Sequence, residues 1–304
     1  MINLTSETAI LLHTGLVTGA PLLWATLGGA YSERSGVINI GLEGMMLTGA
    51  FFGVVVSHTT GNPWLGMLAG AFAGGVLGFL HALVCLWGKA DQIVSGMGIN
   101  LLAYGITGYF LNVIFAMHGN SPAVEKLPSW QGVDNVPFFS QLLFPLSPLH
   151  VFLILILFLT MFLFYKTRFG LRLRACGEDP KVVRSAGVGG DFYRYSAVTI
   201  SGMLAGMGGV QLSLSDISQF SVMMTNGRGF VALAALICSG WRPGRAALIC
   251  LFFGCSIALA DRLQSGFPAI PSRGMLALPF ILALLVLALS RQTSKPPQSL
   301  GKLE

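Results

Sequence analysis

Polar side chains interrupt long apolar runs at a few positions, and these are the places where the sequence could act on a solute. Six of them carry amide, hydroxyl or charged groups that can form hydrogen bonds: Asn39, Glu43, Ser95, Asn100, Gln211 and Arg228. An ionisable group at the centre of a lipid bilayer costs about 2.5–3.5 kcal/mol on insertion scales, so it needs a physical reason. The six are therefore candidates for lining the path of a polar solute.

Asn39 and Glu43 are four residues apart, which places them on one face of a helix. Three glycines within residues 36–44 weaken a helix at the same place. Transporter sites often lie at such interrupted helices, where freed backbone groups and polar side chains line a cavity. The alternative role is structural, with Glu43 near the cytoplasmic end of its span and paired with Arg34 or a loop arginine.

The apolar run that begins near residue 93 is interrupted in the same way, by Gln92, Ser95 and Asn100 among glycines. We expect a kinked or partly unwound stretch here. Ser95 and Asn100 could bond the hydroxyls of a sugar or the edge of a base, which suits a neutral polar solute. They could equally bond neighbouring helices, at about 0.6 kcal/mol each on average.

A third polar group lies between residues 211 and 229, and includes Gln211, Asp216 and Arg228. The span count below places this group at the outer mouth of the bundle. Asp216 and Arg228 could pair across the loop that joins them. Arg228 could instead meet an external partner or gate the entry of a solute.

Residues 167–188, TRFGLRLRACGEDPKVVRSAGV, contain the signals of a short helix. Asp179 before Pro180 is typical of an N-cap followed by the first helical residue, and Gly187 is a natural C-terminal stop. The pattern predicts about two helical turns over 180–186. A helix this short is not stable alone, so it must dock on its own bundle or on a cytoplasmic subunit.

The composition of the chain suits a membrane. Of the 304 residues, 54% are hydrophobic and 10% charged, with a mean hydropathy of +0.73, whereas soluble proteins are about 25% charged. The net charge of +6 and the pI near 9.2 could suggest nucleic acid. The cations lie in short loops between apolar runs, however, where they orient membrane spans, so we predict no nucleic-acid partner.

Apolar runs mark the expected membrane spans. They cover residues 9–31, 37–57, 64–87, 93–117, 149–166, 193–214, 226–241, 246–260 and 274–290. We predict an all-α integral membrane protein, a polytopic bundle of about 9–10 transmembrane helices, some of them interrupted. Residues 41–53 and 227–240 look faintly alike and run in opposite directions, which indicates an inverted repeat.

The distribution of cations predicts the orientation. The segment 166–194 carries seven Lys and Arg residues between two apolar runs, which places it in the cytoplasm. Counting spans from it puts the N-terminus outside and the C-terminus inside. Residues 1–292 then form a single transmembrane domain, with a basic cytoplasmic segment at 167–190 and a proline-rich external loop at 118–148. The polar tail, 293–304, is predicted to be disordered.

Glycine recurs every fourth residue along the third run, at Gly66, Gly70, Gly74 and Gly78. This spacing makes a stripe of small residues on one helix face, which lets another helix approach closely. We therefore expect this span to be central in the bundle.

The sequence shows no catalytic, metal or nucleotide motif. The five cysteines form no CxxC pair, the histidines are scattered, and neither an HExxH pair nor a GxSxG elbow occurs. An intramembrane enzyme is therefore disfavoured, and no metal site is predicted. The phosphate-binding pattern GxxxxGK[ST] does not occur either. We expect no cofactor in this chain and ATP to be handled by another polypeptide.

Three stretches resemble the permeases of bacterial sugar, nucleoside and branched-chain amino-acid ABC importers. In the basic loop, the family's Thr-x-x-Gly, Arg-Ala-x-Gly, Asn-Pro and Gly-Ile pattern is matched from Thr167 to Val188, with Asp179 in place of the Asn and Val183–Arg184 in place of Ala-Ala. ERSGVINIGLEGMMLTGAF at 33–51 resembles the nucleoside and simple-sugar branch, and GRGFVALAALICSGW at 227–241 adds to the likeness.

This resemblance implies a function and partners. A second permease chain, identical or not, would pair with this one in the bacterial plasma membrane, together with a cytoplasmic ABC ATPase and an external substrate-binding lipoprotein. The implied ATPase-coupling residues are Arg174, Gly177, Glu178, Asp179, Pro180, Lys181, Arg184 and Gly187.

An ion-coupled secondary transporter or a channel for a small polar solute is the alternative. Such carriers usually hold paired carboxylates deep in the membrane, where only Glu43 is arguable here, and they would not predict a capped helix in the basic loop. A largely uncharged set of amides and hydroxyls suits nucleosides or simple sugars better than amino acids, which require charge recognition.

Overall fold

The computed structural model describes residues 4–129, 146–266, 281–282, 285 and 296–302, and these residues are mostly helical. The helices are α1 (Leu4–Arg34), α2 (Leu42–Thr60), α3 (Pro63–Ala82), α4 (Gln92–Phe115), α6 (Pro148–Lys166), α7 (Arg168–Glu178), α8 (Pro180–Ser185), α9 (Gly190–Val210), α10 (Arg228–Ser239) and α11 (Pro243–Gly266). Two π-helical turns, η1 (Leu83–Trp87) and η2 (Gln211–Ile217), extend α3 and α9. The predicted all-α class is confirmed.

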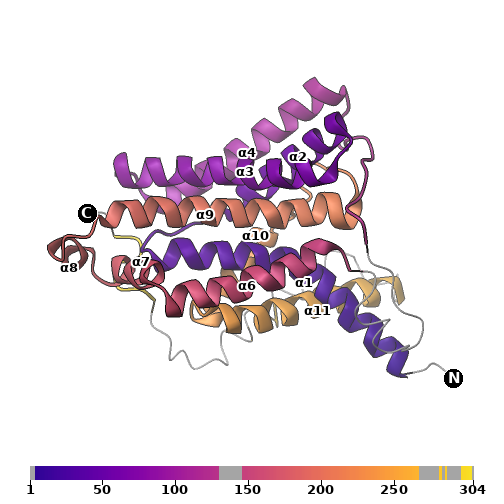
Figure 1. The fold of residues 1–304 in the computed structure, drawn as a ribbon. Helices are drawn as coiled ribbons and strands as arrows, with labels where there is room; N and C mark the ends of the chain where they lie inside the picture. Colours follow the sequence, from indigo (N-terminus) through magenta and orange to yellow (C-terminus); the bar gives the residue numbers. More distant parts are fainter. Residues whose placement is uncertain (1–3, 130–145, 267–280, 283–284, 286–295, 303–304) are drawn as a thin grey trace.

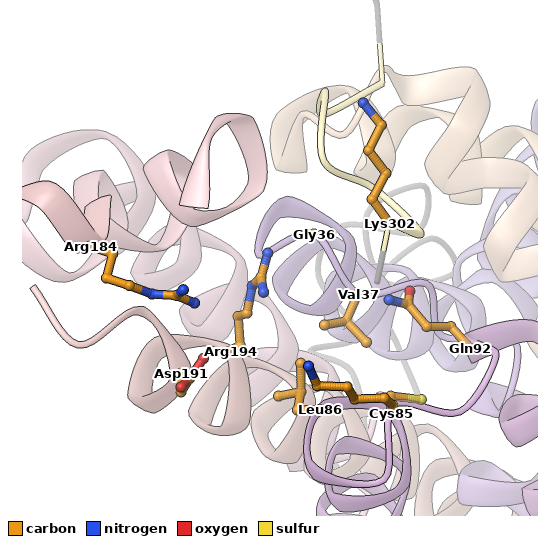
Figure 2. A pocket seen from close by; sticks show the side chains of 10 residues that line it. Gly36, Val37, Cys85, Leu86, Gln92, Arg184, Asp191, Arg194 and Lys302 are labelled. Carbon is orange, nitrogen blue, oxygen red and sulfur yellow. The ribbon is translucent and has the colours of Figure 1, made fainter. Parts of the chain in front are cut away.

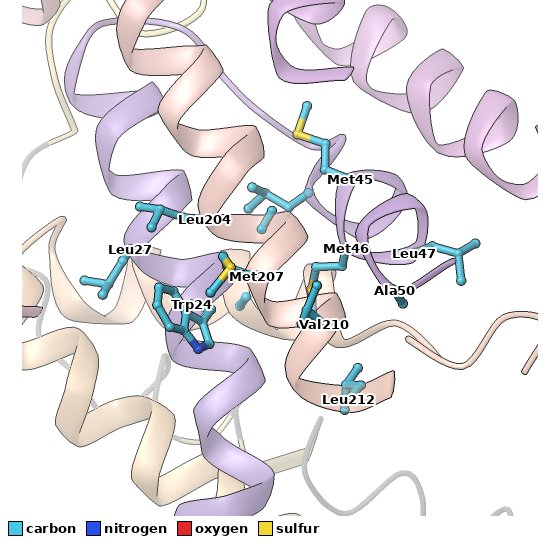
Figure 3. Packing of buried hydrophobic residues seen from close by; sticks show 14 of the residues in the cluster. Trp24, Leu27, Met45, Met46, Leu47, Ala50, Leu204, Met207, Val210 and Leu212 are labelled. Atoms are coloured by element: carbon cyan, nitrogen blue, oxygen red, sulfur yellow. The ribbon is translucent and has the colours of Figure 1, made fainter. Parts of the chain in front are cut away.

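Helix α9 is the centre of the bundle. Figure 1 shows α2, α3 and α4 on one side of it and α1, α6 and α11 on the other. In its most apolar window 83% of the residues of α9 and η2 are buried, against 50% or less for the other five candidate spans. Trp24 and Leu27 of α1, Met46 of α2, and Leu204 and Met207 of α9 lie in the core cluster between these helices (Figure 3). In lipid, such packing acts through van der Waals contact.

The glycine stripe of α3 packs as closely as predicted, but it does not make α3 central. A Cβ atom on Gly74 would lie 2.3 Å from the carbonyl oxygen of Gly202 in α9, and one on Gly70 would lie 2.6 Å from that of Gly49 in α2. The opposite face of α3 is exposed at Leu68 and Phe72. The expectation of a central α3 was wrong. A glycine stripe allows close packing only on the face that carries it, and within the described residues no helix covers the other face of α3.

Six of the described helices are long and apolar enough to cross a membrane: α1, α3 with η1, α4, α6, α9 with η2, and α11. The run 226–241 corresponds to α10, whose 12 residues extend only about 18 Å at about 1.5 Å per residue, less than the about 30 Å of a bilayer core. The run 274–290 lies almost wholly outside the described residues. A multi-pass helical membrane protein is therefore confirmed, while the nine-span count stays a prediction.

The run 37–57 is interrupted, as the sequence predicts. Helix α2 begins only at Leu42, and residues 35–41 are non-helical although they are largely buried. Val37 is 1% exposed and Asn39 0%. A buried irregular stretch leaves backbone groups that need partners other than water, and the side chains that supply them form the candidate site below.

The predicted external loop and the predicted tail both contact the bundle. In the loop 118–148, residues 119–127 form backbone hydrogen bonds with residues 214–222. One of them runs from the Ser121 N–H to the Phe220 carbonyl at 2.8 Å, and residues 130–145 lie outside the described residues. In the tail, disorder was predicted for 293–304, yet residues 296–302 pack on the bundle. The Ser299 N–H donates to the Gly177 carbonyl at 2.9 Å, and the Gly301 N–H to that of Gly36 at 3.2 Å. These contacts could not be predicted from the polar composition of the tail, because they are made by backbone groups.

Candidate functional site

The interrupted stretch before α2 is held by side chains from α3 and α4. The Ile38 N–H donates to Oε1 of Gln92 at 2.7 Å, and the Ile38 carbonyl lies 2.9 Å from Nε2 of His81. Because a carbonyl can only accept, Nε2 of His81 carries the hydrogen. In a neutral ring, Nδ1 then accepts from the Ser95 hydroxyl, 2.9 Å away. Gln92 and His81 thus replace the missing helical partners of Ile38.

Asn100 continues this support further along α4. Its Nδ2 donates to the Ile40 carbonyl at 3.1 Å, and its Oδ1 accepts from the Gly44 N–H at 2.8 Å. Gly44 is in the first turn of α2, where backbone N–H groups have no helical partner. In this chain the hydrogen bonds of Ser95 and Asn100 therefore join α4 to α3 and to the start of α2. These are the contacts expected if the two residues bond neighbouring helices.

Asn39 faces the central helix. Its Nδ2 donates to the Ser201 hydroxyl of α9 at 2.9 Å. Its Oδ1 is buried and has no hydrogen-bond partner among the described residues. Buried polar atoms are rarely left in this state, so each one needs an explanation, such as a water or a solute.

Glu43 holds the start of α10, which is distant in sequence. One carboxylate oxygen accepts from the Thr225 hydroxyl at 2.6 Å and from the Gly227 N–H at 2.8 Å, and the other accepts from the Gly229 N–H at 2.6 Å. A helix leaves its first N–H groups unsatisfied and carries a partial positive charge at that end. The Glu43 carboxylate provides acceptors for the N–H groups of Gly227 and Gly229, and its negative charge opposes the partial positive charge of the helix end. Glu43 thus has a structural role, as the alternative proposed. Its partner, however, is the start of α10, whereas the alternative named Arg34 or a loop arginine.

The contact between these two helix starts is tight. A Cβ on Gly229 would lie 2.5 Å from the Cα and from the N of Glu43, so no larger residue fits without a shift. The chain enters this contact through positive φ angles at Met223, Asn226 and Gly227. The stretches 33–51 and 227–241, which carry much of the likeness described above, therefore meet in space.

The other end of α10 is fixed by the end of α1. The Trp241 indole N–H donates to Oε2 of Glu33 at 2.5 Å, and Nε of Arg34 donates to the Trp241 carbonyl at 3.2 Å. Glu33 is 3% exposed. Both ends of this short helix are thus held by charged groups from residues 33–43. Sequence reasoning did not single out Glu33 or Trp241, and only their place inside the two similar stretches could have indicated them.

Gln211 and Arg228, the two remaining path candidates, do not lie together in one cluster. Nε2 of Gln211 lies 3.3 Å from Nε2 of His150 and 3.4 Å from Oδ1 of Asp216, and its Oε1 is buried without a partner among the described residues. Arg228 donates from Nη1 to the Met224 carbonyl at 3.1 Å and interacts electrostatically with Asp216 and Glu43. Arg228, the first residue of α10, therefore lies near enough to interact both with Asp216, which Gln211 contacts, and with Glu43.

Most of the path candidates are enclosed by this one chain. Asn39 and Gln211 are 0% exposed, Glu43 1% and Asn100 4%. Their donors and acceptors serve mainly backbone groups and neighbouring side chains. The amide oxygens of Asn39 and Gln211, which have no partner among the described residues, can accept a hydrogen bond from a neutral polar solute. Because both side chains are buried, a solute reaches them only when the helices move or when it replaces a present contact.

The predicted short helix in the basic loop is confirmed. It runs from Pro180 to Ser185, the Asp179 carboxylate accepts from the N–H groups of Lys181 and Val182 at 2.9 and 3.2 Å, and Gly187 has a φ of +72°. Pro180 and Val183 are buried against the chain's own helices, whereas Val182 is 63% exposed. The helix therefore docks on its own bundle and presents an apolar residue outward.

The other members of the coupling set are divided between the surface and the interior. Glu178, Asp179, Lys181, Arg184 and Gly187 are exposed. Arg174 is half-buried, with its guanidinium 5.5 Å from the centre of the Tyr165 ring. Gly177 is buried, and a Cβ there would lie 2.2 Å from the Arg34 carbonyl oxygen. Gly177 therefore serves close packing, while the exposed members form a surface.

Arg194 joins this region to the membrane helices, and sequence reasoning missed it. It is 6% exposed and donates to the carbonyls of Ser35 at 3.3 Å and Cys176 at 3.4 Å. Ser299 of the tail reaches the same corner, where its hydroxyl lies 2.6 Å from the Gly177 carbonyl oxygen. Within the described ranges, no group of three or more His, Cys, Asp or Glu side chains could hold a metal ion.

Comparison with known proteins gives consistent matches over nearly the whole chain. The family model described as branched-chain amino acid transport system / permease component matches residues 11–289. The chain is 36% identical to a nucleoside ABC transporter permease of Lactococcus lactis subsp. cremoris, over 98% of each chain. It is 36% identical to a guanosine ABC transporter permease of Bacillus subtilis, over 92% of this chain and 91% of that one. It is 35% identical to a putative glucose ABC transporter permease of Haloferax volcanii, over 86% of this chain and 79% of that one.

Proposed function

Because the chain belongs to the family of branched-chain amino acid transport system permease components, we propose that it forms the membrane path of an ATP-driven importer of nucleosides. The observation that carries the substrate class is the 36% identity, over more than nine-tenths of the chain, to permeases named for a nucleoside and for guanosine. Simple sugars are the related alternative, supported by the glucose permease likeness.

The side chains support an uncharged solute. Asn39 and Gln211 hold the two buried amide oxygens without a partner among the described residues, and an amide oxygen accepts from a hydroxyl or an amino group. The buried carboxylate of Glu43 is occupied by α10. Because the candidates are enclosed within one chain, we place the path between this chain and a second permease subunit, opened by a movement of these helices.

The cations support a cytoplasmic location for the end of the bundle that carries α7 and α8. Lys89, Arg184, Arg194 and Lys302 lie around one cavity at this end, although they come from distant parts of the sequence. The positive-inside rule assigns such an end to the cytoplasm, which puts the N-terminus outside and the C-terminus inside.

Helix α8 is the proposed contact for a separate ABC ATPase. It is capped, it rests on Pro180 and Val183, and it leaves Lys181, Val182 and Arg184 exposed. In this proposal ATP is bound and hydrolysed by the partner, this chain needs no cofactor of its own, and an external lipoprotein delivers the solute. A rigid six-residue element can transmit motion from such a partner to α7 and α9.

One experiment tests both parts of the proposal. The chain is reconstituted in vesicles with its second permease, its ATPase and its receptor, and the uptake of radiolabelled nucleosides and sugars is measured. We expect ATP-dependent accumulation of a nucleoside, and no uptake when residues 180–186 are replaced by a flexible linker although the chain still inserts. Uphill uptake by vesicles that hold this chain alone would instead support the secondary-transporter alternative.

A further inference from the structure

The C-terminal segment, residues 296–302, packs on the corner where the basic loop meets the interrupted stretch before α2. Figure 1 shows it at the end of the bundle that carries α7 and α8. Figure 2 shows Lys302 of this segment near Gly36, with which it lines one cavity. Ser299 is 6% exposed, and Leu300 packs against the core cluster described above. The segment is therefore part of the packed structure, although its composition is polar.

One side of the segment holds the end of α7. The Ser299 N–H donates to the Gly177 carbonyl at 2.9 Å, and the Ser299 hydroxyl lies 2.6 Å from the carbonyl oxygen of Gly177 and 3.1 Å from that of Cys176. A helix leaves its last carbonyl groups without helical partners. Ser299 thus satisfies the end of α7, two residues before Asp179, which caps α8.

The other side of the segment holds the interrupted stretch. The Gly301 N–H donates to the Gly36 carbonyl at 3.2 Å, and a Cβ on Gly301 would lie 2.8 Å from Cδ1 of Ile38. Gly301 has a φ of +76°, a backbone conformation that favours glycine. The next residue after Ile38 is Asn39, whose buried amide oxygen is a candidate contact for the solute. The segment thus contacts the stretch that carries a path candidate.

The two sides of this corner also touch each other directly. A Cβ on Gly36 would lie 2.8 Å from Oγ of Ser299 and 3.5 Å from the Cα of Gly177. Gly36 has a φ of +96°, so a larger residue would be strained there as well as crowded. Close packing of this kind transmits a displacement from one element to the next.

We propose that the segment 296–302 is a transmission element of the importer, with Ser299 and Gly301 as its positioning residues. It joins the end of α7, next to the helix assigned to ATPase contact, to the stretch that holds Ile38 and Asn39. A displacement of α7 and α8 by the ATPase then reaches this stretch through the hydrogen bonds of Ser299 and Gly301. This role rests on the proposed function of the chain.

The test uses the complete importer, reconstituted with the full-length chain. The test variant is Gly301→Pro, because proline has no N–H for the Gly36 carbonyl and its fixed negative φ excludes +76°. Gly301 is exposed and lies near the C-terminus, so the membrane helices should fold normally. The matched control is Gln298→Ala, at an exposed position of the same segment. Thermal unfolding, hydrogen exchange, ATP hydrolysis and uptake of labelled nucleoside are measured for each chain.

We expect Gly301→Pro to unfold near the natural temperature and to exchange faster in residues 35–38 and 299–302. ATP hydrolysis should continue, while the nucleoside taken up per ATP hydrolysed falls severalfold, because the ATPase then moves α8 without moving the path. Gln298→Ala should match the natural chain. Gly301→Asn keeps the N–H and tolerates a positive φ, so it should recover most of the lost coupling.

A segment with only a structural role would lower the stability of Gly301→Pro and leave the uptake per ATP unchanged. The proposal is therefore overturned if Gly301→Pro releases the segment without changing this ratio, or if exchange in residues 35–38 does not respond. These outcomes refute the role of the segment alone. Absence of ATP-driven uptake by the natural chain would refute the proposed function and this role together.

Discussion

The two short helices α8 and α10 are both capped by a carboxylate, but the carboxylates come from very different places. Asp179 directly precedes α8 and bonds N–H groups two and three residues later, at the exposed surface. Glu43 lies 182–186 residues from the groups it bonds at the start of α10, and it is 1% exposed. The cap of α8 comes from the adjacent residue in the chain, whereas the cap of α10 depends on the position of α2.

This difference bears on which element can move. Helix α8 carries its cap with it and can shift as a unit against α7 and α9 without breaking it. Helix α10 is bonded at its start by Glu43 and at its end by Glu33 and Arg34, so it cannot move relative to α1 and α2 without losing buried hydrogen bonds. We infer that α8 transmits motion and that α10 is part of a unit moved as a whole.

The largest effect should come from Glu43→Ala. This change leaves the buried Thr225 hydroxyl and the buried Gly229 N–H without an acceptor, at about 1–3 kcal/mol for each unsatisfied group, and also the half-buried Gly227 N–H. The thermal unfolding midpoint in detergent should fall sharply, and uptake should be lost. Glu125→Ala, at an exposed carboxylate, should change the stability by less than about 0.5 kcal/mol. Equal midpoints for the two variants would show that Glu43 does not hold α10.

A somewhat smaller effect is expected from Gly229→Ala. The added methyl group would lie 2.5 Å from the Glu43 backbone, so α10 must shift, at about 1–3 kcal/mol for such overpacking. Gly108→Ala in α4, where a Cβ meets nothing within 4 Å, is the matched control. Thermal unfolding of both variants measures the contrast. If Gly229→Ala unfolds like the control, the tight contact between α2 and α10 is refuted.

Asp179→Ala should act on transport more than on folding. Loss of an N-cap costs about 0.5–2 kcal/mol, and the cost falls on α8 alone because that cap is local. We expect normal membrane insertion and a nearly unchanged unfolding midpoint, together with uptake and coupled ATPase activity reduced severalfold. Asp179→Asn retains a capping side chain and should restore most of the activity. Uptake at the natural level in Asp179→Ala would remove α8 from the coupling role.

The same contrast decides what could be predicted from the sequence. Asp179, Pro180 and Gly187 are neighbours in the chain, so the local rules of helix ends predict α8 nearly to the residue. The interruption before α2 was also predictable, because glycines and polar residues mark it. The partner of Glu43 was not predictable, because Glu43 bonds backbone N–H groups at residues 227 and 229, and every residue except proline carries such a group. Arg194 and Ser299 were missed for a related reason: both bond carbonyl groups, which every residue carries.

The smallest expected effect tests whether the C-terminal segment restrains the α8 side of the molecule. The Ser299 hydroxyl lies 2.6 Å from the Gly177 carbonyl oxygen, so Ser299→Ala removes one hydrogen bond, at about 1 kcal/mol, while the bond from the backbone N–H of Ser299 remains. Hydrogen exchange should become faster in residues 176–187 and stay unchanged in residues 228–239, because α10 is held separately by Glu33 and Glu43. Gln298→Ala, at an exposed neighbour, should alter neither segment. Faster exchange in α10 as well would mean that the two short helices share one support, and the distinction between a mobile α8 and a fixed α10 would fail.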